Sequence, residues 1–171
     1  WAGVDARGRV GVGVAARGQG VSGEKRRICK AAASLVHCGQ QIFRGGSTTA
    51  LQVARLIKDR EHLVVVNNGL YTVLELNFSA GITTIVVGGT MRRRSSSLVG
   101  SFNHDSLRRL RFDIGFFGAR GVSALDGLME AGIEEALLKP QTASAPYSVG
   151  GVVDSSRVEP AADMCLARPR G

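Results

Sequence analysis

The sequence is poor in the features that mark disulfide-rich, metal-binding or hydrolytic proteins. Its 171 residues include three cysteines, Cys29, Cys38 and Cys165. Their odd number and wide spacing fit neither a disulfide framework nor a zinc site, so we expect a reducing, cytoplasmic location and no bound metal. The three histidines lie near no serine–aspartate or cysteine partner in the sequence, and we assign no catalytic residues and no cofactor.

Long apolar runs are also missing. A transmembrane helix needs about 20 consecutive apolar residues, and no segment of this sequence approaches that length. The chain does not open with the charged and then apolar segments of a signal peptide. Apolar residues still make up 44% of the sequence, which is enough for a folded core. We therefore predict one globular domain without a membrane segment.

Acidic residues are outnumbered by basic ones. The chain has 14 aspartates and glutamates against 22 lysines and arginines, which gives a formal net charge of +8. Such a balance favours anionic partners. A compositional bias towards arginine on a solvated surface explains the same charge, and only four of the basic residues are lysine. No basic helix concentrates the charge for DNA recognition.

The most informative stretch is Ile42–Thr49, Ile-Phe-Arg-Gly-Gly-Ser-Thr-Thr. Two apolar residues predict the end of a strand, the glycine pair predicts a turn, and the apolar period that begins at Ala50 predicts a helix. Ser47 or Thr48 is a suitable N-cap. A helix N-terminus after a glycine turn presents backbone N–H groups to an anion, and phosphate is the expected ligand. The alternative is a capped helix after a tight turn that binds nothing.

Apolar runs alternate with amphipathic stretches along the rest of the chain. Expected strands lie at Ile42 and over residues 62–66, 82–87, 112–117 and 149–153. Expected helices cover residues 24–37, 48–59, 70–78, 105–110 and 130–139. The third of these helices has four apolar residues on one side, Leu70, Val73, Leu74 and Phe78. The alternation predicts an α/β, Rossmann-like fold with a mostly parallel sheet and helices on both faces.

Glycine-rich or polar residues follow four of the expected strands. These clusters are Gly45-Gly46-Ser47, Asn67-Asn68, Gly88-Gly89 and Gly118-Ala119-Arg120. Ligands of open α/β sheets bind outside the carboxyl ends of the strands, so we expect the clusters to converge on one site. Three hydroxyl residues and one guanidinium group are suited to bind a small anion there: Ser47, Thr48, Thr49 and Arg92.

A series of short segments follows a fixed order along the chain. The segments are Gly46–Thr49, Asn68–Leu70, Gly88-Gly89-x-x-Arg92, Ser97–Gly100, Phe112-Asp113 through Phe117-Gly118, Gly127-Leu128, Glu135 with Lys139, and Asp154–Ser156. In this order they resemble the C-terminal sensor domain of DeoR-type bacterial transcriptional regulators. The resemblance runs from about Glu24 to Arg157, and its specificity lies in the order, because each segment alone is short.

The resemblance implies a fold similar to that of ribose-5-phosphate isomerase and CoA transferases. It also implies a phosphorylated sugar or related anionic metabolite as effector of a repressor of sugar-metabolism genes. Together with the glycine turn, it suggests the ligand-binding residues Gly45, Gly46, Ser47, Thr48, Thr49, Asn68, Gly88, Gly89, Arg92, Glu135 and Lys139. Members of this family are usually oligomeric, so a homo-oligomer is expected.

The expected domain organisation follows from the same resemblance. Residues 1–22 are expected to be a linker or residual segment, residues 23–158 the sensor domain, and residues 159–171 a poorly matching tail. The N-terminal winged helix-turn-helix of the family is absent from this sequence. We therefore expect the chain to sense an effector and to reach DNA only through that missing element.

The sequence departs from the family pattern at a few positions. Arg44 stands where an acidic residue is usual, Asn67 replaces a threonine, and Arg157 replaces a lysine. Pro140 follows Lys139 where the helix usually continues, so the expected helix is short or bent there. These departures bear on the sugar contacts and on the shape of the pocket.

An isomerase-like enzyme of the same fold is the main alternative function. Isomerases similar to this fold carry Asp-Gly-Ala-Asp where this chain has Phe117-Gly118-Ala119-Arg120. Proton transfer needs a carboxylate base, so we expect binding without turnover. Glu135 and Lys139, four residues apart, have the spacing of a surface ion pair as well as the family's pocket positions. Asp113 lies within an apolar strand and is expected to tie a neighbouring loop.

Overall fold

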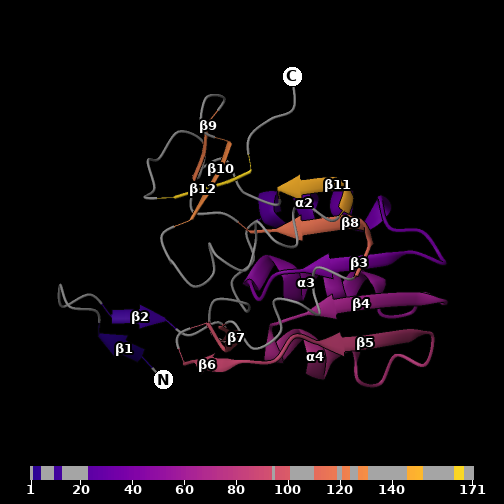
Figure 1. Cartoon of the computed structure of the whole chain (residues 1–171), viewed down its shortest axis with the longest axis horizontal. Helices are drawn as coiled ribbons and strands as arrows, with labels where there is room; N and C mark the ends of the chain where they lie inside the picture. Colours follow the sequence, from indigo (N-terminus) through magenta and orange to yellow (C-terminus); the bar gives the residue numbers. More distant parts are fainter. Residues whose placement is uncertain are drawn as a thin grey trace.

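The structure is a computed structural model of the chain (Figure 1). It describes the backbone of residues 2–4, 10–12, 23–93, 95–100, 110–118, 121–123, 127–130, 146–151 and 164–167. Side chains are described for residues 23–43, 45–93, 95–100 and 110–118. In this part of the chain, no helix is both long enough and apolar enough to cross a membrane.

A five-stranded parallel sheet forms the centre of the fold (Figure 1). Its strands, in spatial order, are β11 (Pro146–Gly151), β8 (Phe112–Phe117), β3 (Gln41–Arg44), β4 (Leu63–Asn67) and β5 (Ile82–Val86). β3 is the middle strand, where Phe43 is in register with Val66 of β4 and with Gly115 of β8. Its neighbours β4 and β8 are nearly continuous apolar runs, as expected for strands covered on both faces.

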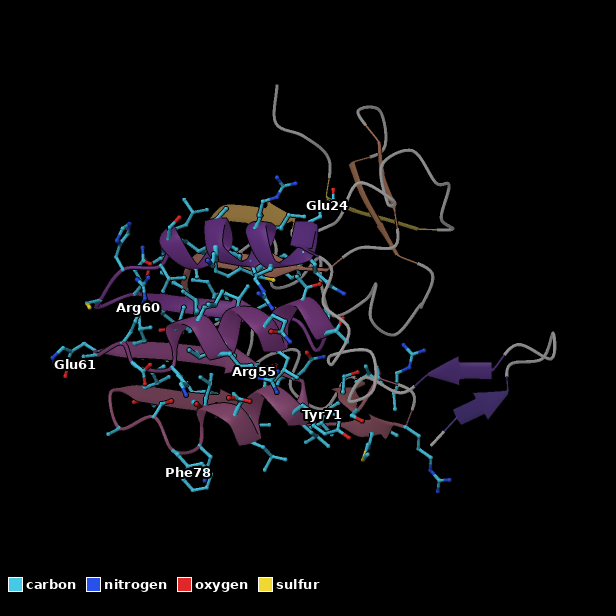
Figure 2. All side chains as sticks on the ribbon, turned by 180° about the vertical axis from the view of Figure 1, so that it is seen from behind. Glu24, Arg55, Arg60, Glu61, Tyr71 and Phe78 are labelled. Atoms are coloured by element: carbon cyan, nitrogen blue, oxygen red, sulfur yellow. The ribbon has the colours of Figure 1, made fainter. Side chains whose placement is uncertain are left out.

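Three helices lie on one face of this sheet, the face towards the viewer in Figure 2. They are α2 (Gly23–Ser34), α3 (Thr48–Ile57) and α4 (Leu70–Leu76). In α3 the buried residues include Ala50, Val53, Ala54 and Ile57, the face that the sequence period predicts. The strand–helix alternation predicted from the sequence is therefore present, and the fold is Rossmann-like α/β.

Two apolar clusters pack on opposite faces of the sheet. The larger cluster includes Ile42 and Val65 from the strands and Ile57 from α3. The smaller cluster includes Phe43 and Val66, which point the other way because successive strand residues face opposite sides. In it the Phe43 ring stacks on the Phe117 ring with centroids 5.4 Å apart. The sheet is thus anchored on both sides, which fixes where its strand ends lie.

Smaller antiparallel sheets complete the described structure. β6 (Thr90–Arg92) pairs with β7 (Ser97–Val99), β10 (Gly127–Glu130) pairs with β9 (Gly121–Ser123) and β12 (Met164–Ala167), and β1 (Ala2–Val4) pairs with β2 (Val10–Val12). The sequence pattern predicts none of these short strands. The predicted helix start at Glu130 is wrong, because this residue ends β10. The predicted last strand lies at 146–151 rather than 149–153.

The predicted apolar side of α4 is not the side that faces the sheet. Thr72 and Leu76 are buried, whereas Leu74 is 64% exposed and Phe78 is 90% exposed. The helix ends at Leu76, so Phe78 lies beyond it. Apolar residues occur all around this short helix, including Tyr71, and their period alone therefore does not select the buried side. The predicted helices over 105–110 and 131–139 fall outside the described residues, apart from Leu110, which precedes β8.

Candidate anion-binding site

The turn between β3 and α3 is held by its own backbone. The N–H of Gly45 donates to a carbonyl of β8 (3.2 Å), and the N–H of Ser47 donates to the carbonyl of Gly45 (2.9 Å). The hydroxyl oxygen of Ser47 accepts from the N–H of Ala50 (3.1 Å), so Ser47 is the N-cap of α3. The N–H groups of Thr48 and Thr49 belong to the first helical turn, where a helix offers no internal acceptor. Backbone donors of this kind are suited to bind an anion.

Three chain segments meet at Gly46. A methyl group there would lie 2.7 Å from Cβ of Ser97 on β7 and 3.1 Å from Cα of Gly69. A methyl group on Gly69 would in turn lie 2.7 Å from Cα of Gly46. Only glycines permit this approach, because real Cβ contacts do not come so close. The ends of β3 and β4 therefore converge as predicted, together with β7, which the prediction did not include.

The hairpin β6–β7 is fixed to the turn after β4 by backbone and amide hydrogen bonds. The N–H of Leu98 donates to the carbonyl of Asn68 (2.8 Å), and Nδ2 of Asn68 donates to the carbonyl of Leu98 (3.0 Å). The N–H of Leu70 donates to the carbonyl of Ser96 (2.9 Å). The hairpin and this turn thus form one wall beside the glycine turn.

Two buried asparagines in that wall have unused hydrogen-bonding atoms. Asn67 is 0% exposed, and its Oδ1 accepts from the N–H of Gly69 (2.6 Å). Among the described residues, Nδ2 of Asn67 and Oδ1 of Asn68 have no hydrogen-bond partner. Oδ1 of Asn68 lies 3.3 Å from the methyl position on Gly46. A buried unsatisfied polar atom costs about 1–3 kcal/mol, so one missing donor and one missing acceptor point to an incomplete site.

A lysine that the sequence analysis missed stands at the same helix end. Nζ of Lys25 donates to Oγ1 of Thr48 (3.2 Å), and Sγ of Cys29 lies 3.8 Å from the carbonyl oxygen of Thr49. Lys25 is in the first turn of α2, so its ammonium lies near the N-termini of two helices. A cation at such an end is unfavourable by about 0.3–1 kcal/mol unless an anion offsets it. A lysine in a first helical turn, where acidic residues are preferred, was the available signal.

Two further predicted glycine positions have a packing role. A methyl group on Gly118, at the end of β8, would lie 3.0 Å from Oγ of Ser47. Gly89 adopts a φ of 146°, and a methyl group there would lie 2.3 Å from the carbonyl oxygen of Val99. Gly88 and Gly89 follow the edge strand β5, and Gly89 contacts β7. Their part in ligand binding stays a prediction.

The remaining predicted ligand contacts are only partly described. Arg92 ends β6 opposite Ser97 of β7, the residue that touches Gly46. Glu135 and Lys139 lie outside the described residues, and so does the side chain of Arg44. The backbone of Arg92 therefore lies beside the strand that contacts Gly46. The ligand contacts of Glu135 and Lys139 stay predictions.

Asp113 lies at the opposite end of the sheet. Its Oδ2 accepts from the N–H of Gln41 at the start of β3 (2.7 Å). Asp113 therefore has a structural contact, but with a strand residue rather than with the loop that the sequence analysis expected. Within the described ranges, no three histidine, cysteine, aspartate or glutamate residues gather as metal ligands would. The carboxyl ends of the strands are thus the candidate site.

Comparison with known proteins identifies the family. A profile of the DeoR C terminal sensor domain matches residues 21–167. The chain belongs to this family. The match extends into the predicted tail and includes β12, while the domain bounds themselves stay a prediction. The matched range contains all the ordered segments on which the resemblance to DeoR-type sensor domains rests.

Several curated relatives of this DeoR sensor domain are transcriptional regulators. The HTH-type transcriptional regulator GolR of Listeria innocua is 31% identical over 79% of this chain and 53% of its own length. The lactose phosphotransferase system repressor of Staphylococcus epidermidis is 33% identical over 79% of this chain and 54% of its own. A putative aga operon transcriptional repressor of Escherichia coli O157:H7 is 28% identical over 78% and 49%. The chain spans about half the length of these relatives.

Solved structures with the same architecture are more distant. Ribose 5-phosphate isomerase A of Methanocaldococcus jannaschii has a TM-score of 0.57 at 18% identity, covering 78% of this chain and 53% of that one. The tetrameric eIF2B-β2-δ2 complex of C. thermophilum contains a chain with a TM-score of 0.59 at 15% identity, covering 82% and 45%. At such identities the likeness shows the fold alone, and it confirms the predicted fold class.

Proposed function

We propose that the chain is the effector-binding domain of a DeoR-type transcriptional repressor and that its effector is a phosphorylated sugar. Two of its relatives are named as repressors, of a lactose phosphotransferase system and of an aga operon. These names support a sugar-related effector. The phosphate and its position are argued from the site itself.

The contact between Lys25 and Thr48 carries the phosphate assignment. It holds an ammonium group beside the N-termini of α2 and α3, where positive charge is unfavourable on its own. A phosphate at this place takes hydrogen bonds from the N–H groups of Thr48 and Thr49 and pairs with Lys25. Figure 2 shows Glu24 at the same end of α2, on the side away from α3. Because Gly45 and Gly46 have no side chains, the phosphate can lie close to the backbone of the turn.

The two asparagines support a sugar as the rest of the ligand. A sugar hydroxyl both donates and accepts, and the site has one unused donor, Nδ2 of Asn67, and one unused acceptor, Oδ1 of Asn68. We propose that the effector supplies these partners when the hairpin β6–β7 moves enough to admit it. Arg92, Glu135 and Lys139 complete the proposed set of ligand contacts.

We propose that binding occurs without turnover. The Phe117 ring is 2% exposed and stacks on Phe43 in the smaller core cluster. It therefore serves packing at a position where isomerases of this fold carry a carboxylate. We expect no measurable isomerisation of ribose 5-phosphate by the pure chain. Turnover that disappears on Glu135→Gln would contradict this assignment and favour the enzyme.

The longer protein that contains such a sensor is proposed to act on DNA through a separate helix-turn-helix. The sensor itself is proposed to work in the cytoplasm, where phosphorylated sugars are found. We expect the chain alone to bind DNA only without sequence preference, at roughly 10⁻⁴–10⁻⁶ M at physiological salt. Its net charge attracts phosphates, and the three helices of the described residues all lie against the sheet, so none of them is free to enter a groove.

Calorimetry tests the phosphate assignment. The chain is titrated with a panel of pentose and hexose phosphates and with the matching free sugars. We expect binding that needs the phosphate and that weakens on Thr48→Val, whereas Thr83→Val on the exposed side of β5 leaves it unchanged. Equal affinity for phosphorylated and free sugars, or no binding across the panel, would contradict the assignment.

A further inference from the structure

The outer face of α2 carries a cluster of basic side chains. Arg26, Arg27 and Lys30 are all exposed, whereas Cys29 and Ala32 of the same helix are buried. At about 100° of rotation per residue, the three cations lie within about 100° of the helix circumference. Figure 2 shows α2 at one end of the row of three helices, next to α3. These three residues are called the basic face of α2 below.

The charges of this helix oppose its own dipole. Four of the first eight residues of α2 are basic, namely the basic face and Lys25, and its last turn has no basic residue. Positive side chains are favoured at the C-terminus of a helix and disfavoured at its N-terminus. Arg26 and Lys30 are also four residues apart, a spacing at which like charges repel each other. Glu24 is the only acidic residue of α2, so the helix does not balance these charges by itself.

The basic face has no structural contacts that would explain its charges. Within the described ranges, none of its three side chains takes part in a hydrogen bond or an ion pair. Lys25 differs from them, because it contacts Thr48, and Arg60 differs because it donates to helix carbonyls. Natural proteins keep unfavourable local arrangements mainly at functional sites. The basic face is therefore suited to a negatively charged partner.

The shape of the face favours an extended polyanion as that partner. Ala31 and Ser34 continue the exposed side of the helix, and both are small and uncharged. The convex side of a helix does not enclose a small anion, but neighbouring cations can each pair with a phosphate of a nucleic-acid backbone. Each such pair releases a condensed counterion. DNA is the polyanion that the proposed function brings to this domain.

We propose that the basic face of α2 is the surface through which this domain contacts the DNA backbone. The proposal rests on the non-specific DNA binding that is part of the proposed function, and it gives that binding a location. The opposite side of α2 packs in the larger core cluster, so the face reaches phosphates from outside the grooves and reads no base edges. The alternative is that DNA binding follows the net charge of +8, wherever the charges lie.

Two variants of equal net charge separate these possibilities. The face variant combines three substitutions in α2: Arg26→Gln, Arg27→Gln and Lys30→Gln. The control variant loses three exposed cations from other parts of the chain: Lys58→Gln, Arg93→Gln and Arg111→Gln. Fluorescence anisotropy then measures the binding of each protein to a labelled random-sequence duplex over a series of salt concentrations.

The salt dependence reports the number of phosphate contacts. In the face variant, the slope of log K against log salt should become less steep by about 2.7, the value for three phosphate contacts, and the Kd at low salt should rise about 10-fold or more. In the control variant, the slope should change by less than about 1, the value for one contact. The thermal midpoint of the face variant should stay the same or rise, because the substitutions relieve repulsion within α2.

Each of the other outcomes overturns the proposal in a recognisable way. Equal changes in the two variants, or no change in the face variant, would show that the net charge attracts DNA without a defined surface. Tighter binding of the wild type to anionic lipid vesicles than to the duplex at the same salt would contradict the choice of DNA. A wild type that does not bind DNA would contradict the DNA-binding part of the proposed function as well, and calorimetry with sugar phosphates would still test the effector site.

Discussion

Two basic side chains in this domain reach helix ends, and they meet opposite ends of the helix dipole. Arg60 donates to the carbonyls of Ala33 and Val36 at the C-terminus of α2, through Nη2 in the first case (3.0 Å) and Nη1 in the second. Lys25 donates to Thr48 at the N-terminus of α3. Figure 2 shows Arg60 at the end of α2 opposite to Glu24. One cation therefore lies where the helix attracts it, and the other where the helix repels it.

The difference separates structural from functional charge. Arg60 donates to two carbonyls at a helix C-terminus, of which that of Ala33 also accepts from the N–H of Val36 (3.2 Å). A cation is favourable at this end of a helix, so the free protein gains stability from it. Lys25 lies where a helix repels positive charge, and Nδ2 of Asn67 and Oδ1 of Asn68 have no partner among the described residues. Natural proteins keep such local conflicts mainly at functional sites. Substitutions at the two cations and at the glycine junction are therefore expected to differ in their effects on stability and on ligand binding.

The largest loss of stability is expected when a side chain is added at Gly46, where three chain segments meet. Gly46→Ala places a methyl group 2.7 Å from Cβ of Ser97 and should lower the free energy of unfolding by about 1–3 kcal/mol, because the junction is overpacked. Gly45→Ala is the matched control, since a methyl group there meets nothing within 4 Å. It should leave stability unchanged or raise it by about 0.4–1 kcal/mol. Urea titration measures both. Equal losses would show that the junction is not close-packed.

A smaller loss is expected at the structural cation. Arg60→Ala removes two hydrogen bonds from a half-buried charged donor and should lower the free energy of unfolding by about 1.5 kcal/mol, the lower end of the range for charged hydrogen bonds. Effector affinity, measured by calorimetry on the folded variant, should not change, because Arg60 is at the far end of α2. A variant that folds normally but loses affinity would remove the distinction between the two cations.

The smallest effect on stability is expected at Lys25. Lys25→Met loses a hydrogen bond worth about 0.5–1.5 kcal/mol and relieves a cation at two helix N-termini, which costs about 0.3–1 kcal/mol at each. The two changes offset each other, so the urea midpoint of the ligand-free protein should barely move. A loss as large as that of Arg60→Ala would make Lys25 a structural residue.

Part of this account could be predicted from the sequence. The run Ile42–Thr49 defines a strand, a glycine turn and a capped helix within a few residues, so local rules suffice to place it. The convergence of the ends of β3 and β4 follows from the rule for parallel sheets. The family resemblance, which rests on the order of the short segments, also predicted the fold class.

Other features depend on packing that local rules do not contain. Lys25 meets Thr48 across two helices, and no spacing in the sequence relates them. The hairpin β6–β7 has no apolar alternation, so its register beside Asn68 was not predictable. On α4, apolar residues surround the helix, and only the position of the sheet decides that Leu76 is inside and Leu74 outside. That Nδ2 of Asn67 and Oδ1 of Asn68 lack partners among the described residues likewise follows from tertiary packing and not from the local sequence.

Titrations of three proteins test the central claim, that Lys25 and the N-terminus of α3 bind a phosphate. The wild type and Lys25→Met are each titrated with the tightest sugar phosphate of the panel and with its free sugar. Lys30→Met, an exposed lysine of the same helix, is the control for net charge. We predict that Lys25→Met weakens binding of the sugar phosphate about 10- to 100-fold, which corresponds to the loss of a charged hydrogen bond. The affinity for the free sugar should stay unchanged. Equal losses for both ligands, or the same loss in Lys30→Met, would contradict the claim.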